Sequence, residues 1–288
     1  MLTELRDTGM KDKLIKTGAC LFGVLGIIDL SCMLLEKCGI TICLSPCVWL
    51  LSVIALSALW YFIDGKFVSG FLVKRIEINL SNLRTRINVF SGDLLVQSGC
   101  AIVPANDFFD NVVNESIVAA KSIDGQMIKQ FWAGNVAEMD ATINEELKGR
   151  PFVEEKRVSP AAKNKRYAIG TNVVLKVRND FRVIWVALTH TDITTNKTHA
   201  EIEDLQLAIR SALVTARNKG NGDVLNVPLM GGGLSRIGLN SSFLLNLLIG
   251  LIVDESKKES VTETINIVLT RKVINELNLL EVKKNWEG

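Results

Sequence analysis

Three short segments of the chain combine residue types that could hold a polar ligand. The first is Ser91-Gly92-Asp93-Leu94, which places a carboxylate just beyond an apolar run. Such a carboxylate can accept a hydrogen bond from an exocyclic amine, for example that of adenine. The second is Val103-Pro104-Ala105-Asn106-Asp107, where the Asn106 amide offers a donor and an acceptor together, which suits ribose hydroxyls. Either segment alone is equally consistent with an ordinary turn.

The third segment is rich in glycine and lies late in the chain. Glycines let backbone N–H groups approach an anion closely, and the start of a following helix favours negative charge. A hydroxyl and a guanidinium at its end could bind phosphate oxygens. It matches neither a Walker loop nor a GxGxxG fingerprint, and a flexible glycine turn is the alternative. Its candidate binding residues are Met230, Gly231, Gly232, Gly233, Leu234, Ser235 and Arg236.

Alternating strands and helices are expected to position these segments. Short apolar runs bounded by turn residues predict strands, and apolar residues near helical spacing predict helices. This alternation predicts an α/β fold with a parallel or mixed sheet covered on both faces, which binds ligands at the carboxyl ends of its strands. The predicted strands are 86–90, 100–104, 167–177 (one or two strands), 182–189, 223–230 and 264–270, and the predicted helices are 115–131, 135–147, 199–219, 240–255 and 272–280.

Composition narrows the function classes. The 288 residues carry 33 basic and 31 acidic side chains, and a net charge of +2 argues against a nucleic-acid-binding surface. The hydrophobic content of 48% excludes disorder. Six cysteines without a paired CxxC pattern and only two histidines, His190 and His199, predict no metal site, and no cofactor is expected.

The surplus of apolar residues lies near the N-terminus. Residues 17–35 contain one charged side chain, Asp29, and residues 40–63 contain none. At about 1.5 Å per helical residue, these segments span roughly 28 and 36 Å against a hydrocarbon core of about 30 Å. They predict a two-helix transmembrane hairpin, with a pair of buried core helices as the alternative. Lysines and arginines before and after the hairpin place both termini and the downstream domain in the cytoplasm.

The predicted domain organisation has three parts. Residues 1–64 form the N-terminal segment and hairpin, residues 65–84 a helical connector, and residues 85–288 the α/β domain. Apolar spacing at Phe67, Phe71 and Leu80 suggests a helix, which is either a signalling stem or a passive linker. Within the α/β domain, 148–172 reads as an extra basic loop, either a solvated loop or a surface for a partner or phosphate.

The order and spacing of the three ligand segments resemble a macro domain, the ADP-ribose-binding module. The resemblance implies a three-layer α/β/α fold with a mixed sheet, in which Asp93 contacts adenine, Ala105 and Asn106 approach the distal ribose, and 230–236 wraps the diphosphate. Leu94, next to Asp93, is a further candidate binding residue. Macro-domain hydrolases usually carry a glycine-rich loop after the asparagine, whereas residues 108–115 here contain no glycine. We therefore expect a binder of an ADP-ribose derivative with no catalytic residues, and a membrane-tethered ADP-ribose hydrolase is the alternative.

A macro domain behind a two-span hairpin is similar to the membrane-anchored macro-domain effectors of Thoeris anti-phage defence. That resemblance implies a TIR-domain enzyme as functional partner, which would make a small nucleotide signal of the histidine-ADP-ribose type. The effector would bind the signal, form a homo-oligomer and disrupt the lipid bilayer of the bacterial inner membrane, causing abortive infection. A constitutive membrane scaffold with a degenerate macro fold is a further alternative.

Overall fold

The computed structural model describes residues 8–37, 46–68, 70, 72–80, 83–114, 116–133, 135–232 and 237–287. The chain divides into two compact units. One comprises Met1–Lys74 with Asn278–Glu281, and the other comprises Arg75–Leu277 with Val282–Gly288.

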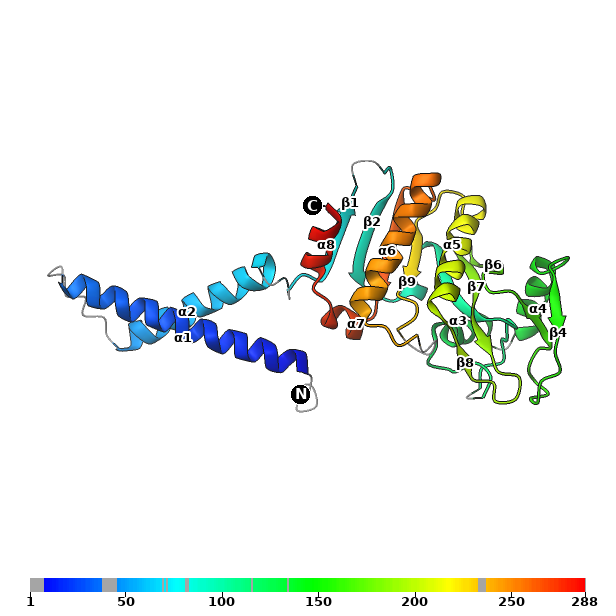
Figure 1. Ribbon diagram of the computed structural model, residues 1–288, viewed down its shortest axis with the longest axis horizontal. Helices are drawn as coiled ribbons and strands as arrows, with labels where there is room; N and C mark the ends of the chain where they lie inside the picture. The colour runs from blue at the N-terminus through cyan, green and yellow to red at the C-terminus, as the bar shows by residue number, and fades with distance from the viewer. Residues whose placement is uncertain are drawn as a thin grey trace. The chain divides into compact units, whose positions relative to one another are not determined.

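The first unit contains two long helices that pack against each other, α1 (Thr8–Lys37) and α2 (Pro46–Ile63) (Figure 1). A short π-helix, η2 (Asp64–Val68), continues α2. Large apolar side chains on both helices are exposed, among them Phe22 and Leu51. Within the part of the chain that is described, one helical stretch, Leu50–Val68, is long and apolar enough to cross a membrane, with a mean hydropathy of 1.5. The two-span hairpin therefore stays a prediction.

The helical connector predicted over 65–84 is wrong for its second half. Arg75–Asn79 form strand β1, which pairs antiparallel with β2 (Arg86–Ser91). Ile76 and Ile78 are buried while their neighbours are exposed, so the apolar pattern has the period of two that belongs to a strand. The spacing from Ile76 to Leu80 also fits a helix, which is why a short apolar segment of this kind misleads.

The second unit is built on one mixed sheet. Among the described residues, eight strands form this sheet in the order β1-β2-β10-β9-β3-β7-β6, with β8 paired to β7. The strands from β2 to β7 in this order run parallel, whereas β1, β6 and β8 are antiparallel to their neighbours. The further strand bounds are β3 Gly99–Asn106, β6 Asn172–Arg178, β7 Phe181–Thr191, β8 Thr198–His199, β9 Leu225–Pro228 and β10 Thr264–Leu269.

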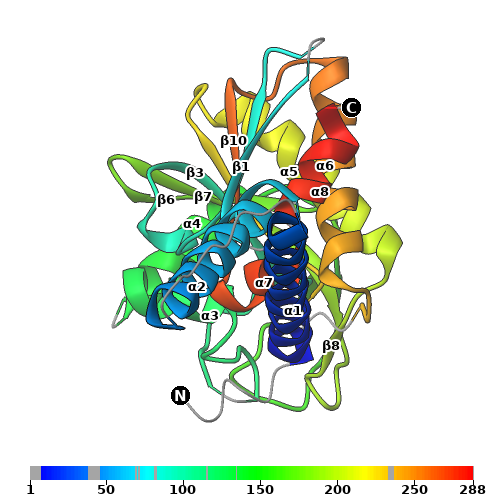
Figure 2. The same ribbon diagram turned by 90° about the vertical axis from the view of Figure 1, so that its left-hand side faces the viewer.

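Helices cover both faces of this sheet, as the three-layer prediction requires (Figure 2). Along β7, alternate residues such as Val183 and Trp185 belong to the buried cluster that contains Met127 of α3 and Ile143 of α4. The residues between them point to the other face, where α5 packs on β7 and α6 packs on α5. The helices are α3 Ile123–Trp132, α4 Val136–Glu146, α5 Ile202–Lys219, α6 Ser241–Lys258, α7 Arg271–Glu276 and α8 Leu279–Glu287.

The structure confirms the predicted strands and most predicted helices, with two corrections. The helix expected over 115–131 begins only at Ile123, because Ser122 caps it by accepting a hydrogen bond from the Gly125 amide at 3.2 Å. The helix expected over 272–280 is interrupted at Leu277, whose backbone is extended, so two helices replace one. The basic segment 148–172 contains a separate hairpin, β4 (Phe152–Glu154) and β5 (Lys165–Tyr167).

Candidate functional site

The carboxyl edge of the parallel strands has a topological switch point between β3 and β9. From β3 the chain proceeds toward β7 on one side, and from β9 it proceeds to β10 on the other. Pairing between the two strands covers only Cys100–Leu225 and Ala101–Asn226, although β3 continues to Asn106. In open α/β sheets, ligands bind outside the carboxyl ends of the strands at such a point. The candidate site therefore lies where β3 and β9 separate.

A row of asparagine side chains aligns the strands below this point. The Asn88 amide donates to Asn266 at 3.0 Å, and the Asn266 amide donates to Asn226 at 2.9 Å. Asn226 is fully buried and donates to the carbonyls of Ser98 and Cys100. This ladder crosses β2, β10 and β9 and reaches the β3 backbone. It therefore fixes how the carboxyl ends of these strands are aligned with one another.

Asp93 follows β2 at this edge, as predicted. One of its carboxylate oxygens accepts a hydrogen bond from the Leu95 amide at 2.9 Å and so caps the short helix η3 (Leu94–Val96). The other oxygen has no hydrogen bond to any described residue, and Asp93 is exposed. Leu94 is buried beneath it. The geometry leaves one acceptor of Asp93 open to a ligand amine.

The predicted ribose contact, Asn106, is used inside the protein. Asn106 is 6% exposed, and its carbonyl oxygen accepts from the Phe108 and Asp110 amides at 3.1 Å each. Its Nδ2 donates to Asp110 at 2.9 Å. Ala105 before it is buried as well. Asn106 thus shapes the loop after β3, and direct contact with a ribose would have to share or replace these hydrogen bonds.

The glycine segment after β9 is described as far as Gly232. Met230 is buried, and Gly231 has φ +94°, a conformation that favours glycine. A Cβ on Gly231 would lie 3.1–3.3 Å from Ile237, Leu244 and Leu205, whereas one on Gly232 would meet only Leu244, at 3.6 Å.

The remaining predicted residues of this segment, Gly233, Leu234, Ser235 and Arg236, lie outside the described residues. Helix α6 begins just beyond them, capped by Asn240, which accepts from the Phe243 amide at 2.8 Å. A helix start at this position favours an anion nearby.

A buried carboxylate cluster beside Asn106 was missed from the sequence. Asp107 is fully buried, 3.1 Å from the Arg166 guanidinium, and accepts from the Thr191 amide. Burial raises the pKa of Asp107, while Thr191, Arg166 and His190 act in the opposite direction. The only sequence signal was the position of Asp107, directly after Asn106.

His190 extends this cluster to helix α5. Its Nε2 lies 3.1 Å from Asp204, and its ring lies 5.6 Å from that of His199 on the paired strand. Asp204 also accepts from the Glu201 amide at the start of α5. The next residue, Leu205, is one of the side chains that surround Gly231. The glycine segment and the histidine pair therefore both adjoin the first turn of α5.

Basic residues from 148–172 stabilise the loop after β3 through buried contacts. The Arg157 and Asp110 side chains form an ion pair and are 0% and 1% exposed. Arg157 also donates to Asn196 at 2.6 Å and lies over the Phe108 ring. The Lys163 amide donates to Asp110 at 2.9 Å. The interpretation of this segment as a solvated loop is wrong for Arg157, because that side chain anchors the loop that carries Asn106.

Comparisons with known proteins show the family of the chain. The family "Thoeris protein ThsA, Macro domain" matches residues 87–270. The "Thoeris protein ThsA" of Bacillus amyloliquefaciens (strain Y2) is 23% identical over 233 residues, 76% of this chain and 74% of that protein.

Solved structures support the same fold. The Oceanobacillus iheyensis macrodomain with ADP is 12% identical, with a TM-score of 0.50 over 73% of this chain and 96% of that one. A mutant of that macrodomain with ADPR is 14% identical, with a TM-score of 0.51 over 74% of this chain and 100% of that one. At these identities the likeness concerns the fold alone.

Proposed function

Because the chain belongs to the macro-domain family of the Thoeris protein ThsA, we propose that its second unit binds an ADP-ribose-derived signal in anti-phage defence. The observation that carries the proposal is the switch point, flanked by Asn106 and the glycine segment, with Asp93 on the same edge. Strands β2 and β3 are three spacings apart, about 14 Å at 4.7–4.9 Å per strand. This distance suits a ligand with two sugars and a diphosphate better than a single nucleoside.

In this proposal Asp93 accepts a hydrogen bond from adenine, and the amides from Gly231 onward bind the diphosphate. Solved macrodomains of the same fold were obtained with ADP and with ADPR. The open oxygen of Asp93 and the positive φ of Gly231 support these roles. We assign to the signal a histidine-ADP-ribose type of structure, made by a TIR-domain enzyme that acts with this protein.

We further propose that the first unit is a two-span hairpin in the bacterial inner membrane, with both termini and the macro domain in the cytoplasm. Large apolar side chains are exposed on α1 and α2, and Leu50–Val68 meets the length and composition of a span. Soluble proteins rarely expose so much apolar surface to water, whereas the hydrocarbon core of a bilayer accommodates it. Signal binding then drives homo-oligomerisation and membrane disruption, which kills the infected cell. Such coupling requires tighter binding of the signal to the assembled state.

We propose binding without turnover. The Asn106 amide is held by the loop that it shapes, and 108–115 contains no glycine. A membrane-tethered ADP-ribose hydrolase is the competing function. Multiple turnover of an ADP-ribosylated substrate by the purified protein, without signal-driven assembly, would establish the hydrolase instead.

The deciding experiment uses the full chain reconstituted in liposomes that contain a fluorescent dye. ADP-ribose and its histidine conjugate are titrated by calorimetry, and dye release is followed in parallel. We expect binding and release with the wild-type protein. Asp93→Ala and Gly232→Glu are expected to abolish both effects while leaving membrane insertion intact.

Glu263→Ala is the matched control, because it removes an exposed carboxylate next to the amino end of β10, on the opposite edge of the sheet. It should behave as the wild type does. Binding that persists in both site variants would disprove the assignment of the site, and signal binding without dye release would disprove the membrane role.

A further inference from the structure

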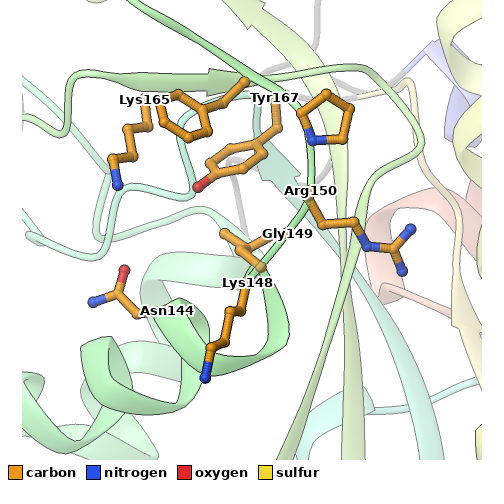
Figure 3. A pocket seen from close by; sticks show the side chains of 9 residues that line it. Asn144, Lys148, Gly149, Arg150, Lys165 and Tyr167 are labelled. Carbon is orange, nitrogen blue, oxygen red and sulfur yellow. The ribbon is translucent and has the colours of Figure 1, made fainter.

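A pocket lies between the end of α4 and the β4–β5 hairpin (Figure 3). Its volume is about 600 Å³, within the usual range for small-molecule sites. It belongs to the second unit and is built from residues that the proposed signal site does not use. Its lining includes Asn144, Lys148, Arg150, Phe152, Lys165 and Tyr167.

The pocket is basic, because six of the seven cationic residues of 148–172 fall into two groups and one group lines it. Arg157, Lys163 and Arg166 form ion pairs with Asp110, Asp140 and Asp107. Lys148, Arg150 and Lys165 line the pocket, and none of its lining residues is acidic.

The lining cations are weakly engaged within the protein. Lys148 has one ion pair, with Glu145 at 3.6 Å, in which both side chains are 75% exposed. Solvent screens such an exposed pair, so it contributes little to stability. Glu154 lies opposite Lys165 in the hairpin register, but no ion pair joins them. An anion could therefore bind to Lys148 and Lys165 without breaking a strong ion pair.

An aromatic side chain supplies a hydrogen-bond donor among these cations. Figure 3 shows the Tyr167 hydroxyl directed into the pocket, on the side of Lys165 and Asn144, while Arg150 extends the opposite way. That hydroxyl has no hydrogen-bond partner among the described residues. Burial raises the pKa of Tyr167, so the group remains a donor at neutral pH. Lys165, Tyr167 and Asn144 thus offer donors to one side of the pocket.

Phe152 adds an apolar, planar surface beside these donors. Phe152 is 46% exposed, with the Lys165 ammonium 4.7 Å from the centroid of its ring and the Tyr167 ring 6.0 Å away. Leu147 and Pro151 extend the apolar lining. A flat ring could pack against Phe152 while an attached anion reaches the lysines.

We propose that this pocket binds a phosphate monoester joined through a sugar to a planar ring, the chemistry of a mononucleotide. A phosphate monoester carries nearly two negative charges at neutral pH and presents three acceptor oxygens. Lys148, Lys165 and Tyr167 bind the phosphate, and Phe152 packs against the ring. The pocket is a second site, and its existence does not depend on the proposed signal site.

The test measures binding of AMP to the full chain in lipid nanodiscs by calorimetry. It is done in the Gly232→Glu background so that the glycine segment does not contribute. We expect AMP binding that the double variant Lys148→Ala, Lys165→Ala weakens about tenfold or more, since hydrogen bonds to charged groups contribute about 1.5–3 kcal/mol. Tyr167→Phe keeps the buried ring and should weaken binding about tenfold by removing the hydroxyl alone.

Lys129→Ala is the matched control, because it removes an exposed lysine of α3 that does not line the pocket, and it should leave AMP binding unchanged. Adenosine and inorganic phosphate should both bind more weakly than AMP. AMP binding that is absent with Gly232→Glu, or unchanged in the lysine double variant, would overturn the proposal. Adenosine binding as tightly as AMP would overturn the anion assignment, and equal binding of inorganic phosphate would overturn the role of the ring.

Discussion

Replacing Arg157 with methionine is expected to destabilise the second unit and to loosen the loop that carries Asn106. Methionine retains most of the side-chain volume but leaves the Asp110 carboxylate buried without its cation. Removing one partner of a buried ion pair usually costs about 3–5 kcal/mol. Asp110 keeps hydrogen bonds from the Asn106 side chain and the Lys163 amide, which lowers that penalty. We therefore expect the free energy of unfolding of the second unit to fall by about 3 kcal/mol.

The loss can be measured by thermal unfolding of the full chain, followed by near-ultraviolet circular dichroism. For a domain of this size, about 3 kcal/mol corresponds to a Tm decrease of about 6–12 °C. Lys219→Met is the matched control, since the Lys219–Glu146 pair is 50% and 29% exposed. Such a pair should contribute no more than about 1 kcal/mol. The affinity for ADP-ribose should fall with Arg157→Met and not with the control.

A double-mutant cycle tests the reasoning directly. Asp110→Asn leaves the Arg157 charge buried without its counterion, so it is also expected to be destabilising. The variant with both changes should be more stable than the sum of the single losses implies, with a coupling of at least about 1.5 kcal/mol. Effects that add to within about 0.5 kcal/mol would show that the two side chains do not stabilise each other, and the argument would fail.

Three further predictions follow from the same structure. Gly231→Ala should weaken ADP-ribose binding and lower Tm, because φ is +94° and the Cβ would crowd Leu205 and Leu244, whereas Gly232→Ala should do neither; equal effects in calorimetry and melting would refute this. The raised pKa of Asp107 means that the folded protein binds a proton there more tightly than the unfolded chain, whose carboxyl has a pKa of 3.8. The contribution of Asp107 to the free energy of unfolding therefore falls as pH rises from below 3.8 through the raised pKa. Asp107→Asn should remove this part of the pH dependence, measured by urea unfolding from about pH 3.5 to 7. An unchanged slope of the unfolding free energy against pH would contradict the prediction. Leu59→Arg places a charge in the proposed span at a cost of about 2.5–3.5 kcal/mol, so the variant should be extracted from membranes by alkaline carbonate more readily than Leu207→Arg, which alters an exposed leucine of α5.

Local pattern in the sequence was enough to find most strands and the long helices. The apolar strand at 182–189 and the helix at 199–219 have clear periodicity and clear ends, and both are present with small changes of boundary. Strand β1 was missed because the run is short: Ile76 and Leu80 have helical spacing, while Ile76 and Ile78 have the spacing of a strand. The start of α3 depends on one capping side chain, Ser122, which periodicity does not report.

The positions of the site residues on the sheet could be predicted from the sequence, whereas the hydrogen bonds and ion pair that hold them could not. Asp93, Asn106 and Gly231 all lie at or just after the carboxyl ends of parallel strands of one sheet, as their positions after apolar runs suggested. That Asn106 is held by Asp110, and Asp110 by Arg157, depends on a contact between residues 47 positions apart. A charged residue in a basic segment looks the same in sequence whether it is solvated or buried. Only the three-dimensional arrangement separates Arg157 from Lys165.

The asparagine ladder has a consequence for synthesis of the protein. Asn88 and its partner Asn266 are separated by 178 positions in the chain. At the usual elongation rate of about 5–20 residues per second, roughly 9–36 s pass between their appearances on the ribosome. During that interval the edges of β2 and β9 that face β10 have no partner strand. A nascent or prematurely terminated chain that lacks β10 is therefore expected not to bind the proposed ligand, even when it already contains Asp93, Asn106 and Gly231.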